Sequence, residues 1–417
     1  MGNGLRLITV PMQENETVTV LVLVEAGSSY ETKAKNGISH FLEHMCFKGT
    51  AKRPTAHAIS AELDGLGAQY NAFTSHEYTG YYAKSDAKNF SQIFDIVSDI
   101  YLNSTFPKAE IEKEKGVIIE EINMYEDIPQ RKVDEELGVL MYGDTPAGWG
   151  IAGPRENIRA MTRNDFLKYH KAHYVPKATT IVVAGHVTEA EVAKIAKKIF
   201  GTIKSAPKSG KKKTIEKQSV PAVRIVAKKT DQAHLILALR SVDMYHKDDT
   251  ILDVLAAVLA GGMSSRLFQK LREEMGVAYY VRSSQNGFTD HGYLDIRAGV
   301  DTKRTLEVIS VLLAELKNIR DHGVTEEELV RTKASMIGNI KLELESSDAF
   351  AQYFGGQEVF HKKVKTPKEV IAKIEAVQAR DIARVAKSIV KNNGLNLALI
   401  GPYEQRFTKE IRSILKL

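Results

Sequence analysis

Runs of β-branched and apolar residues predict strands at three places in the first half of the chain. Residues 17–27, TVTVLVLVEAG, show the β-branched alternation that favours a strand. Residues 68–84 predict two adjacent strands joined by a polar turn at residues 75–77. Residues 179–185 predict a further strand.

Helical periodicity lies between and after these strands. It predicts helices at about residues 57–65, 89–103 and 108–127. Thr188 and Glu191 form a capping-box pattern, which predicts the start of another helix. The pattern therefore indicates a mixed α and β protein.

The composition changes abruptly at residues 203–221, where Lys, Ser, Pro and Gly replace the apolar periodicity. Such a stretch is typical of a linker between domains. We therefore expect a first domain at residues 1–205, a linker at 206–221 and a second domain at 222–417. We expect the three lysines at 211–213 to be solvated rather than to bind nucleic acid.

Length and composition set the broad class. A chain of 417 residues is longer than a domain with a single hydrophobic core usually is, which favours two or more domains. No apolar run approaches the length of a membrane span, and the first residues lack the pattern of a secretory signal. The chain has a single cysteine, Cys46, as is common in proteins of a reducing compartment, and we expect it to act as a small apolar side chain. The net charge of +6 gives only a weak indication of what the protein binds. We expect a cytoplasmic protein without a membrane span or a nucleic-acid partner.

A short stretch at residues 37–50 carries the candidate chemistry. Residues four apart lie on one face of a helix, so His40 and His44 can present two imidazoles to one cation, with Glu43 beside them. The same pattern also occurs on ordinary solvated helix faces. The apolar neighbours Phe41 and Leu42 instead indicate partial burial, and buried charges need partners or a metal.

Two histidines make an incomplete zinc site, because catalytic zinc normally takes three protein ligands. A carboxylate is expected from the predicted helix at residues 108–127. There Glu114 and Glu121 lie seven apart on one face, whereas Glu120 points about 100° away from it.

The His-x-x-Glu-His order and the paired carboxylates resemble the pitrilysin family of zinc metallopeptidases, or inverzincins, including their half-size members and the catalytic subunit of mitochondrial processing peptidase. The resemblance implies that His40, His44 and Glu121 hold Zn²⁺. It implies that Glu43 is the general base and that Glu114 orients a histidine ligand. It also implies an α+β fold of two duplicated domains, each a mainly antiparallel sheet with helices packed on one face.

The second half repeats the helical pattern without the ligands. When residues 106–127 are written over residues 324–345, the apolar face is kept, but Glu114 falls on Thr332 and Glu121 on Asn339. The region that matches His40 to His44 is 258–262, which has no ligand. The second domain is therefore expected to have the fold without the metal.

The resemblance also implies where a substrate would bind. One strand edge would pair with the peptide backbone as an added strand, through Asn71, Ala72, Phe73 and Thr74. Phe73 would form part of a side-chain pocket or, equally well, belong to the core. Arg272 and Tyr279 of the second domain would contact the substrate carbonyl and stabilise its developing negative charge.

These expectations add up to a zinc endopeptidase that acts on peptides or unfolded protein segments. Because full-length relatives carry four such domains, the resemblance implies a homodimer in which one chain's zinc site meets Arg272 and Tyr279 of the other. Two alternatives stay open. One is the catalytic subunit of a heterodimeric presequence-processing peptidase, and the other is a noncatalytic core-type structural subunit of the same fold.

Overall fold

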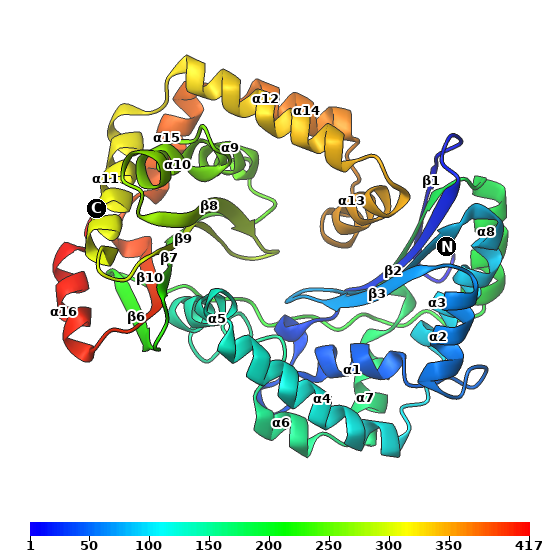
Figure 1. The fold of residues 1–417 in the computed structure, drawn as a ribbon. Helices are drawn as coiled ribbons and strands as arrows, with labels where there is room; N and C mark the ends of the chain where they lie inside the picture. Colours follow the sequence, from blue (N-terminus) through cyan, green and yellow to red (C-terminus); the bar gives the residue numbers. More distant parts are fainter. The chain divides into compact units, whose positions relative to one another are not determined.

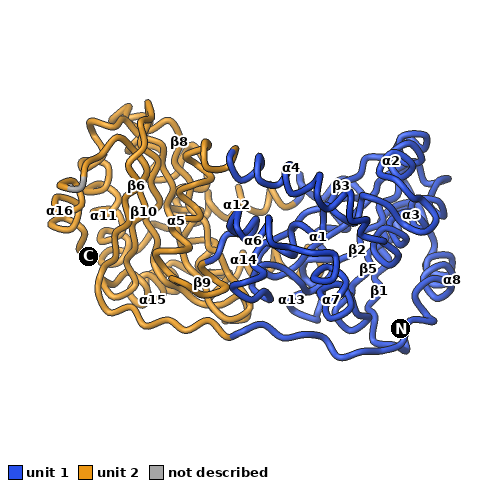
Figure 2. Tube along the Cα trace, turned by 90° about the horizontal axis from the view of Figure 1, so that it is seen from below, with its two compact units in different colours: residues 1–123, 149–212, 341–365 blue, residues 124–148, 213–340, 366–417 orange. Residues whose placement is uncertain are grey.

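The computed structural model describes residues 1–417, apart from the side chain of Gln405. The chain forms two compact units, coloured separately in Figure 2. Unit 1 comprises residues 1–123, 149–212 and 341–365, and unit 2 comprises residues 124–148, 213–340 and 366–417. No helix of this described chain is long and apolar enough to cross a membrane.

Unit 1 is built on a five-stranded sheet with the strand order β1-β5-β2-β4-β3. The pairing of β1 with β5 is parallel, and the other neighbours are antiparallel. The strands are β1 (Arg6–Pro11), β2 (Thr17–Val24), β3 (Gln69–Thr74), β4 (Thr79–Asp86) and β5 (Thr179–Gly185). The strands expected from the sequence at residues 17–27, 68–84 and 179–185 are therefore confirmed.

Unit 2 repeats this arrangement strand for strand, in the order β6-β10-β7-β9-β8. Again the first pair, β6 with β10, is parallel and the rest are antiparallel. The strands are β6 (Ala222–Ala227), β7 (Gln232–Arg240), β8 (Ala278–Gly287), β9 (Gly292–Asp301) and β10 (Leu395–Gly401). Two sheets of the same order confirm the expected α+β fold of two duplicated domains.

The helices follow in chain order (Figure 1). Those mainly of unit 1 are α1 (Ile38–Cys46), α2 (Ala56–Gly65), α3 (Phe90–Leu102), α4 (Lys108–Asp127), α6 (Arg155–Ala160), α7 (Arg163–His173), α8 (Glu189–Phe200) and α13 (Ser347–His361). Those mainly of unit 2 are α5 (Pro129–Tyr142), α9 (Asp249–Ala260), α10 (Arg266–Phe268), α11 (Thr305–His322), α12 (Glu326–Glu343), α14 (Pro367–Ala376), α15 (Ala379–Ile389) and α16 (Gln405–Ile414).

The central strand β2 shows that helices cover both faces of the unit 1 sheet, whereas helices on one face only were expected. Seven of its eight residues are buried, so neither face can be left to water. Val20 and Val22 point into the core formed with α1, α3 and α8, whereas Leu21 and Leu23 point into a second cluster with α13. Figure 1 shows α13 on one side of these strands and α3 and α8 on the other.

Each unit therefore takes one helix from the other half of the sequence. α13 lies in the second half of the sequence but belongs to unit 1, and α5 lies in the first half but packs on Ile236 and Ala238 of the unit 2 sheet through Val133 and Leu137. The units are thus discontinuous in sequence, unlike the contiguous stretches 1–205 and 222–417 expected from the linker. The physical reason is that each two-sided sheet needs a cover for its second face.

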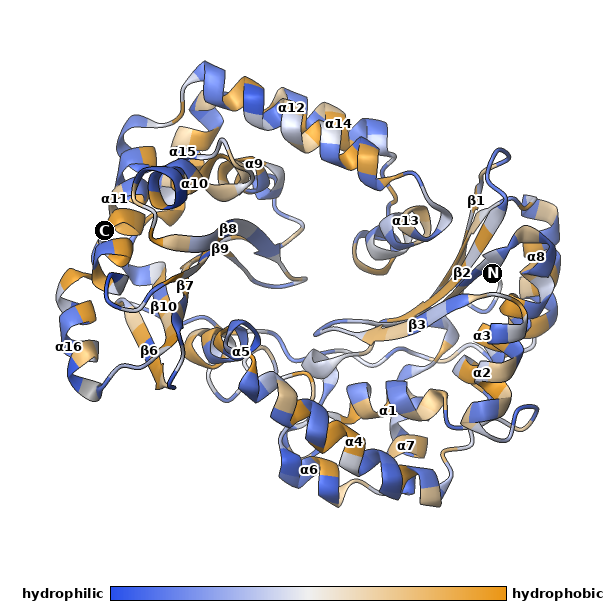
Figure 3. Cartoon of the chain, in the orientation of Figure 1, coloured by the Kyte–Doolittle hydropathy of each residue, from blue (hydrophilic) through white to orange (hydrophobic). Residues whose placement is uncertain are grey.

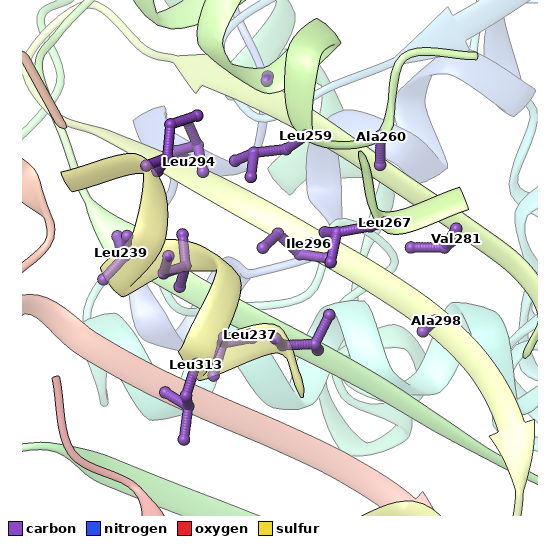
Figure 4. Close-up of a cluster of buried hydrophobic side chains, with 14 of the residues drawn as sticks. Leu237, Leu239, Leu259, Ala260, Leu267, Val281, Leu294, Ile296, Ala298 and Leu313 are labelled. Carbon is purple, nitrogen blue, oxygen red and sulfur yellow. The ribbon is translucent and has the colours of Figure 1, made fainter. Parts of the chain in front are cut away.

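Figure 3 shows the hydropathy of the residues: β2 is largely apolar, and α4 and α12 alternate between polar and apolar turns. In unit 2 the main core brings Leu237 and Leu239 of β7 and Ile296 of β9 against Leu259 and Leu313 from helices (Figure 4). Burial of these side chains is the main stabilising contribution to this unit.

Ion pairs fasten the exchanged helices. In unit 1, the buried Glu25 pairs with Lys362, just after α13, and Lys84 Nζ lies 2.6 Å from Asp348 Oδ1 at its start. In unit 2, α5 is held through Asp134, which pairs with an arginine of β9. Each exchanged helix therefore has charged contacts with its sheet as well as apolar ones.

The expected linker has no helix or strand, but it is not free. Lys208 Nζ lies 2.6 Å from Glu25 Oε2, and Lys211 Nζ lies 2.8 Å from the buried Glu77 Oε1. The Thr214 amide donates to Asp290 Oδ2 at 2.7 Å in unit 2. The expectation that Lys211 is simply solvated is wrong, because a buried carboxylate needs a cationic partner.

Candidate metal centre

The helix α1 begins where its sequence requires it. Gly37 precedes it with φ +99°, and a Cβ there would lie 2.5 Å from the Ala152 carbonyl oxygen, so the position needs glycine. Ile38, Phe41 and Leu42 are buried in the unit 1 core. The histidines and Glu43 lie on the remaining surface of this amphipathic helix.

Three donor atoms converge beside α1. His40 Nε2 lies 3.3 Å from His44 Nε2, and Glu121 Oε2 of α4 lies 3.5 Å from the former and 3.6 Å from the latter. Within the described chain, one group of three or more His, Cys, Asp or Glu side chains is close enough together to hold a metal ion, and it consists of His40, His44 and Glu121. The sequence-based grouping of these residues therefore corresponds to a real juxtaposition.

The triangle has the dimensions of a zinc site. Zinc binds histidine nitrogen at about 2.0–2.1 Å in tetrahedral geometry, which places neighbouring donors about 3.3–3.4 Å apart. The observed edges of 3.3, 3.5 and 3.6 Å are close to that spacing. The donor set, two imidazoles and one carboxylate, also leaves a fourth position for water or substrate. The residues present fit Zn²⁺.

The protonation state of His40 suits metal binding, and the orientation of His44 does so too. Burial, and then the neighbouring His44, lower the pKa of His40 to about 4, so its ring is neutral near pH 7 and Nε2 offers a lone pair. His44 Nδ1 hydrogen bonds with Glu114 Oε1 at 2.8 Å, which directs Nε2 to the other donors. Burial lowers the pKa of His44, but this hydrogen bond and nearby carboxylates raise it further than burial lowers it.

Glu114 is held in turn by Lys48, a residue that the sequence analysis missed. Lys48 Nζ lies 2.6 Å from Glu114 Oε2. Although burial raises the pKa of Glu114, its hydrogen bonds with His44 and Lys48 bring it below its usual value, so the carboxylate is charged. The position of Lys48, four residues after His44, is the signal that could have identified it.

Glu43 stands beside the donors but outside their triangle. Its Oε2 accepts a hydrogen bond from Thr74 Oγ1 at 2.5 Å. Burial raises the pKa of Glu43, and the Thr74 hydrogen bond partly opposes that change. A carboxylate with a raised pKa is a stronger base, as proton transfer requires.

A cavity of about 560 Å³ adjoins Glu43 and His44. The strand β3 forms one wall of it through Tyr70, Asn71 and Ala72. β3 is the last strand of the sheet order and pairs with β4, so its other edge lies open to an added strand. Four predicted substrate-binding residues therefore lie on an edge strand beside the donor cluster: Asn71, Ala72, Phe73 and Thr74.

The side chain of Phe73 points to the other face of the sheet. Its ring lies edge-on to Tyr78 at 5.8 Å and packs with Leu23 in the cluster under α13. Phe73 also lines a cavity of about 190 Å³ together with Leu23 and Tyr78, so the placement is compatible with both roles expected for it.

Arg272 and Tyr279 lie together within unit 2. Arg272 belongs to a π-helical turn, Gln269–Glu274, and its guanidinium donates to the backbone carbonyl of Tyr279 at the start of β8. The Tyr279 side chain is 58% exposed. Tyr279 is on the edge strand that corresponds to β3, Arg272 lies in the turn that precedes this strand, and the exposed phenol has room to contact a ligand.

The metal-free counterpart in unit 2 is also assembled as expected. Val258 and Gly262, which match the two histidines, line a small cavity together with Thr332 and Asn339, which match Glu114 and Glu121. Its volume is about 50 Å³. The sequence alignment of the two halves therefore identified spatially equivalent positions.

Comparison with known proteins gives family and fold. Residues 6–155 match the family model described as insulinase (peptidase family M16), and residues 160–336 match the one described as peptidase M16 inactive domain. A Bacillus subtilis protein named uncharacterized zinc protease YmxG is 35% identical over 401 residues, 96% of this chain and 97% of its own. An uncharacterized zinc protease of Streptomyces coelicolor is 32% identical over 415 residues, 97% of this chain and 89% of its own.

Two solved structures share the fold. A protease from Helicobacter pylori superimposes with a TM-score of 0.88 at 24% identity, covering 96% of this chain and 97% of that one. A peptidase M16 inactive domain from Pseudomonas fluorescens gives a TM-score of 0.89 at 17% identity, covering 97% of each chain. At these identities the likeness is one of fold alone.

Proposed function

Because the chain belongs to peptidase family M16, which confirms the resemblance inferred from its sequence, we propose that it is a zinc-dependent endopeptidase acting on peptides or unfolded protein segments. The observation that carries the proposal is the triangle of His40, His44 and Glu121 donors with the basic carboxylate of Glu43 beside it.

Each residue has a role in this proposal. His40, His44 and Glu121 hold the metal, and Glu114 keeps the His44 ring oriented. Zn²⁺, when bound, polarises the scissile carbonyl and makes water acidic enough to react near neutral pH. Glu43 takes the proton from that water and passes it to the leaving amine.

The proposed substrate lies along the open edge of β3. Main-chain hydrogen bonds from an added strand read backbone rather than side chains, so many sequences fit. A stably folded protein cannot offer an extended segment, which makes it a poor substrate. We further propose a homodimer, in which Arg272 and Tyr279 of one chain stabilise the negative charge developing at the zinc site of the other.

A matched pair of glutamate variants tests the proposal. Glu43→Gln should retain one zinc per chain and lose cleavage of an unstructured peptide by at least about a hundredfold, because the base is gone while the donors remain. Glu120→Gln, on the exposed side of α4, should keep both zinc and activity. Zinc lost together with activity in Glu43→Gln would show that Glu43 is a ligand, and full activity would show that it is not the base.

The noncatalytic alternative predicts a site without its ligands. Here the three donor residues and Glu43 are all present and within reach of one another. Wild-type protein that neither binds zinc stoichiometrically nor cleaves an unstructured peptide would favour that alternative.

A further inference from the structure

A buried carboxylate that the proposed mechanism does not use lies just before α1, the helix that carries His40 and His44. Glu31 is 4% exposed and sits seven residues before the start of α1. Both of its oxygens face donors: Oε2 accepts from Asn36 Nδ2 and from the Gly37 amide, each at 2.8 Å, and Oε1 accepts from the Ser39 amide at 2.8 Å. Burying a carboxylate is costly unless its acceptors are used, and here they are.

These donors are the ones that a helix cannot satisfy by itself. The first four amides of an α-helix have no intrahelical partner. Gly37 precedes α1 and Ser39 is its second residue, so Glu31 accepts from two of the four. The positive end of the helix dipole also favours a carboxylate at this place.

The helix needs this support because it is short. α1 has nine residues, and helices of this length are marginal in water without tertiary contacts. Its first turn carries His40, the residue immediately after Ser39. Loss of the Glu31 contacts would therefore displace His40, one of the three metal donors, first.

Two neighbouring contacts restrict the same turn. Asn36 Nδ2 donates to the Gly150 carbonyl at 3.0 Å as well as to Glu31, and Ser39 Oγ lies 2.7 Å from Tyr169 Oη. Glu31 thus sits at the centre of a network that joins the entry of α1 to the loop at Gly150 and to α7. Hydrogen-bonded networks of this kind restrict a buried turn to one conformation.

We propose that Glu31 is a positioning residue for the metal centre, which holds the first turn of α1 so that His40 Nε2 stays within tetrahedral distance of His44 Nε2. This assignment rests on the proposed zinc site and concerns its geometry rather than the chemical step. A displacement of about 1 Å at His40 would spoil a donor spacing of 3.3 Å.

The test compares two buried glutamates of unit 1. Glu31→Gln places an amide NH₂ against at least one of the three donors, whereas Glu25→Gln disturbs a carboxylate of similar burial that pairs with Lys208 and Lys362 and has no hydrogen bond to α1. Zinc affinity is measured by competition with a chromogenic chelator, and site geometry by the visible absorption of the Co²⁺-loaded protein. Glu31→Gln should bind zinc at least about tenfold more weakly and change the Co²⁺ spectrum. Glu25→Gln should lower stability and leave both unchanged.

Two results would overturn the assignment. One is a Glu31→Gln protein that is less stable but keeps wild-type zinc affinity and Co²⁺ spectrum, because Glu31 would then only stabilise the fold. The other is the same outcome for Glu31→Asp, whose side chain keeps the charge but is too short to reach the amides of both Gly37 and Ser39. Glu31→Asp takes the place of Glu31→Gln in the test if Glu31→Gln does not fold. Failure of wild-type protein to bind zinc would instead refute the proposed function, so the two failures are distinguishable.

Discussion

The contact between α13 and the unit 1 sheet gives a prediction with a built-in control. Gly355 and Gly356 are adjacent in the middle of α13, yet their surroundings differ. A Cβ on Gly355 would lie 2.6 Å from Leu23 Cδ1 and 3.3 Å from Leu21 Cδ2, both in the buried cluster. A Cβ on Gly356 would have nothing within 4 Å.

The two alanine variants should therefore shift stability in opposite directions. Replacing a helical glycine by alanine contributes roughly 1 kcal/mol in either case. At Gly355 the added methyl also overpacks the interface, which costs about 1–3 kcal/mol. We expect Gly356→Ala to be about 1 kcal/mol more stable than wild type, and Gly355→Ala to be up to about 2 kcal/mol less stable.

Urea unfolding followed by tryptophan fluorescence measures this difference. The single tryptophan, Trp149, lies in unit 1, so its signal reports on the unit that α13 completes. The midpoint of Gly355→Ala should fall below that of Gly356→Ala with an unchanged slope. Equal stabilisation by both variants would refute the seating of α13 on β2.

Three other outcomes are expected. Glu114→Gln should weaken zinc binding by about 10–100-fold in chelator competition, because the group that orients His44 loses its charge; unchanged affinity would contradict that role. A His44→Ala chain mixed with an Arg272→Ala chain should regain peptidase activity if the site is composite, whereas mass-verified mixed dimers without recovery would exclude it. Hydrogen bonds from Arg266 lower the pKa of Glu328 from 4.5 to about 2, so the ionised Glu328 stabilises the folded protein above pH 4.5 and this stabilisation is lost as the pH falls towards 2. The free energy of unfolding of Glu328→Gln should therefore depend less on pH over that range than that of the wild type, and an equal dependence would contradict this role of Glu328.

The donor cluster could be predicted from the sequence because two of its residues are close in sequence and the third is given by the family resemblance. His40 and His44 share a helical face by spacing alone, and the family resemblance selected Glu121 from a helix with two candidate carboxylates. The same spacing could not show Glu31 or Lys48, since a charged residue near a helix end is common and its hydrogen bonds depend on the folded loop.

The exchange of α5 and α13 could not be predicted from periodicity. An amphipathic pattern shows that a helix has an apolar face but not which sheet receives it. The nearly continuous apolar run of β2 did carry a signal, because a strand buried on both faces requires two covering layers. Lys211 was misjudged for a related reason: its partner Glu77 is distant in sequence, and composition alone is blind to such a pair.

The exchange of helices also sets the order in which a nascent chain can fold. Domains generally fold as units during synthesis, starting from the N-terminus. Here the sheet of unit 1 is translated early, but the helix that covers Leu21 and Leu23 ends only at His361. Until most of the chain has left the ribosome, that apolar face stays open to water and to other chains. Synthesis of this protein is therefore a stage at which chaperones that bind exposed apolar surface have a defined target.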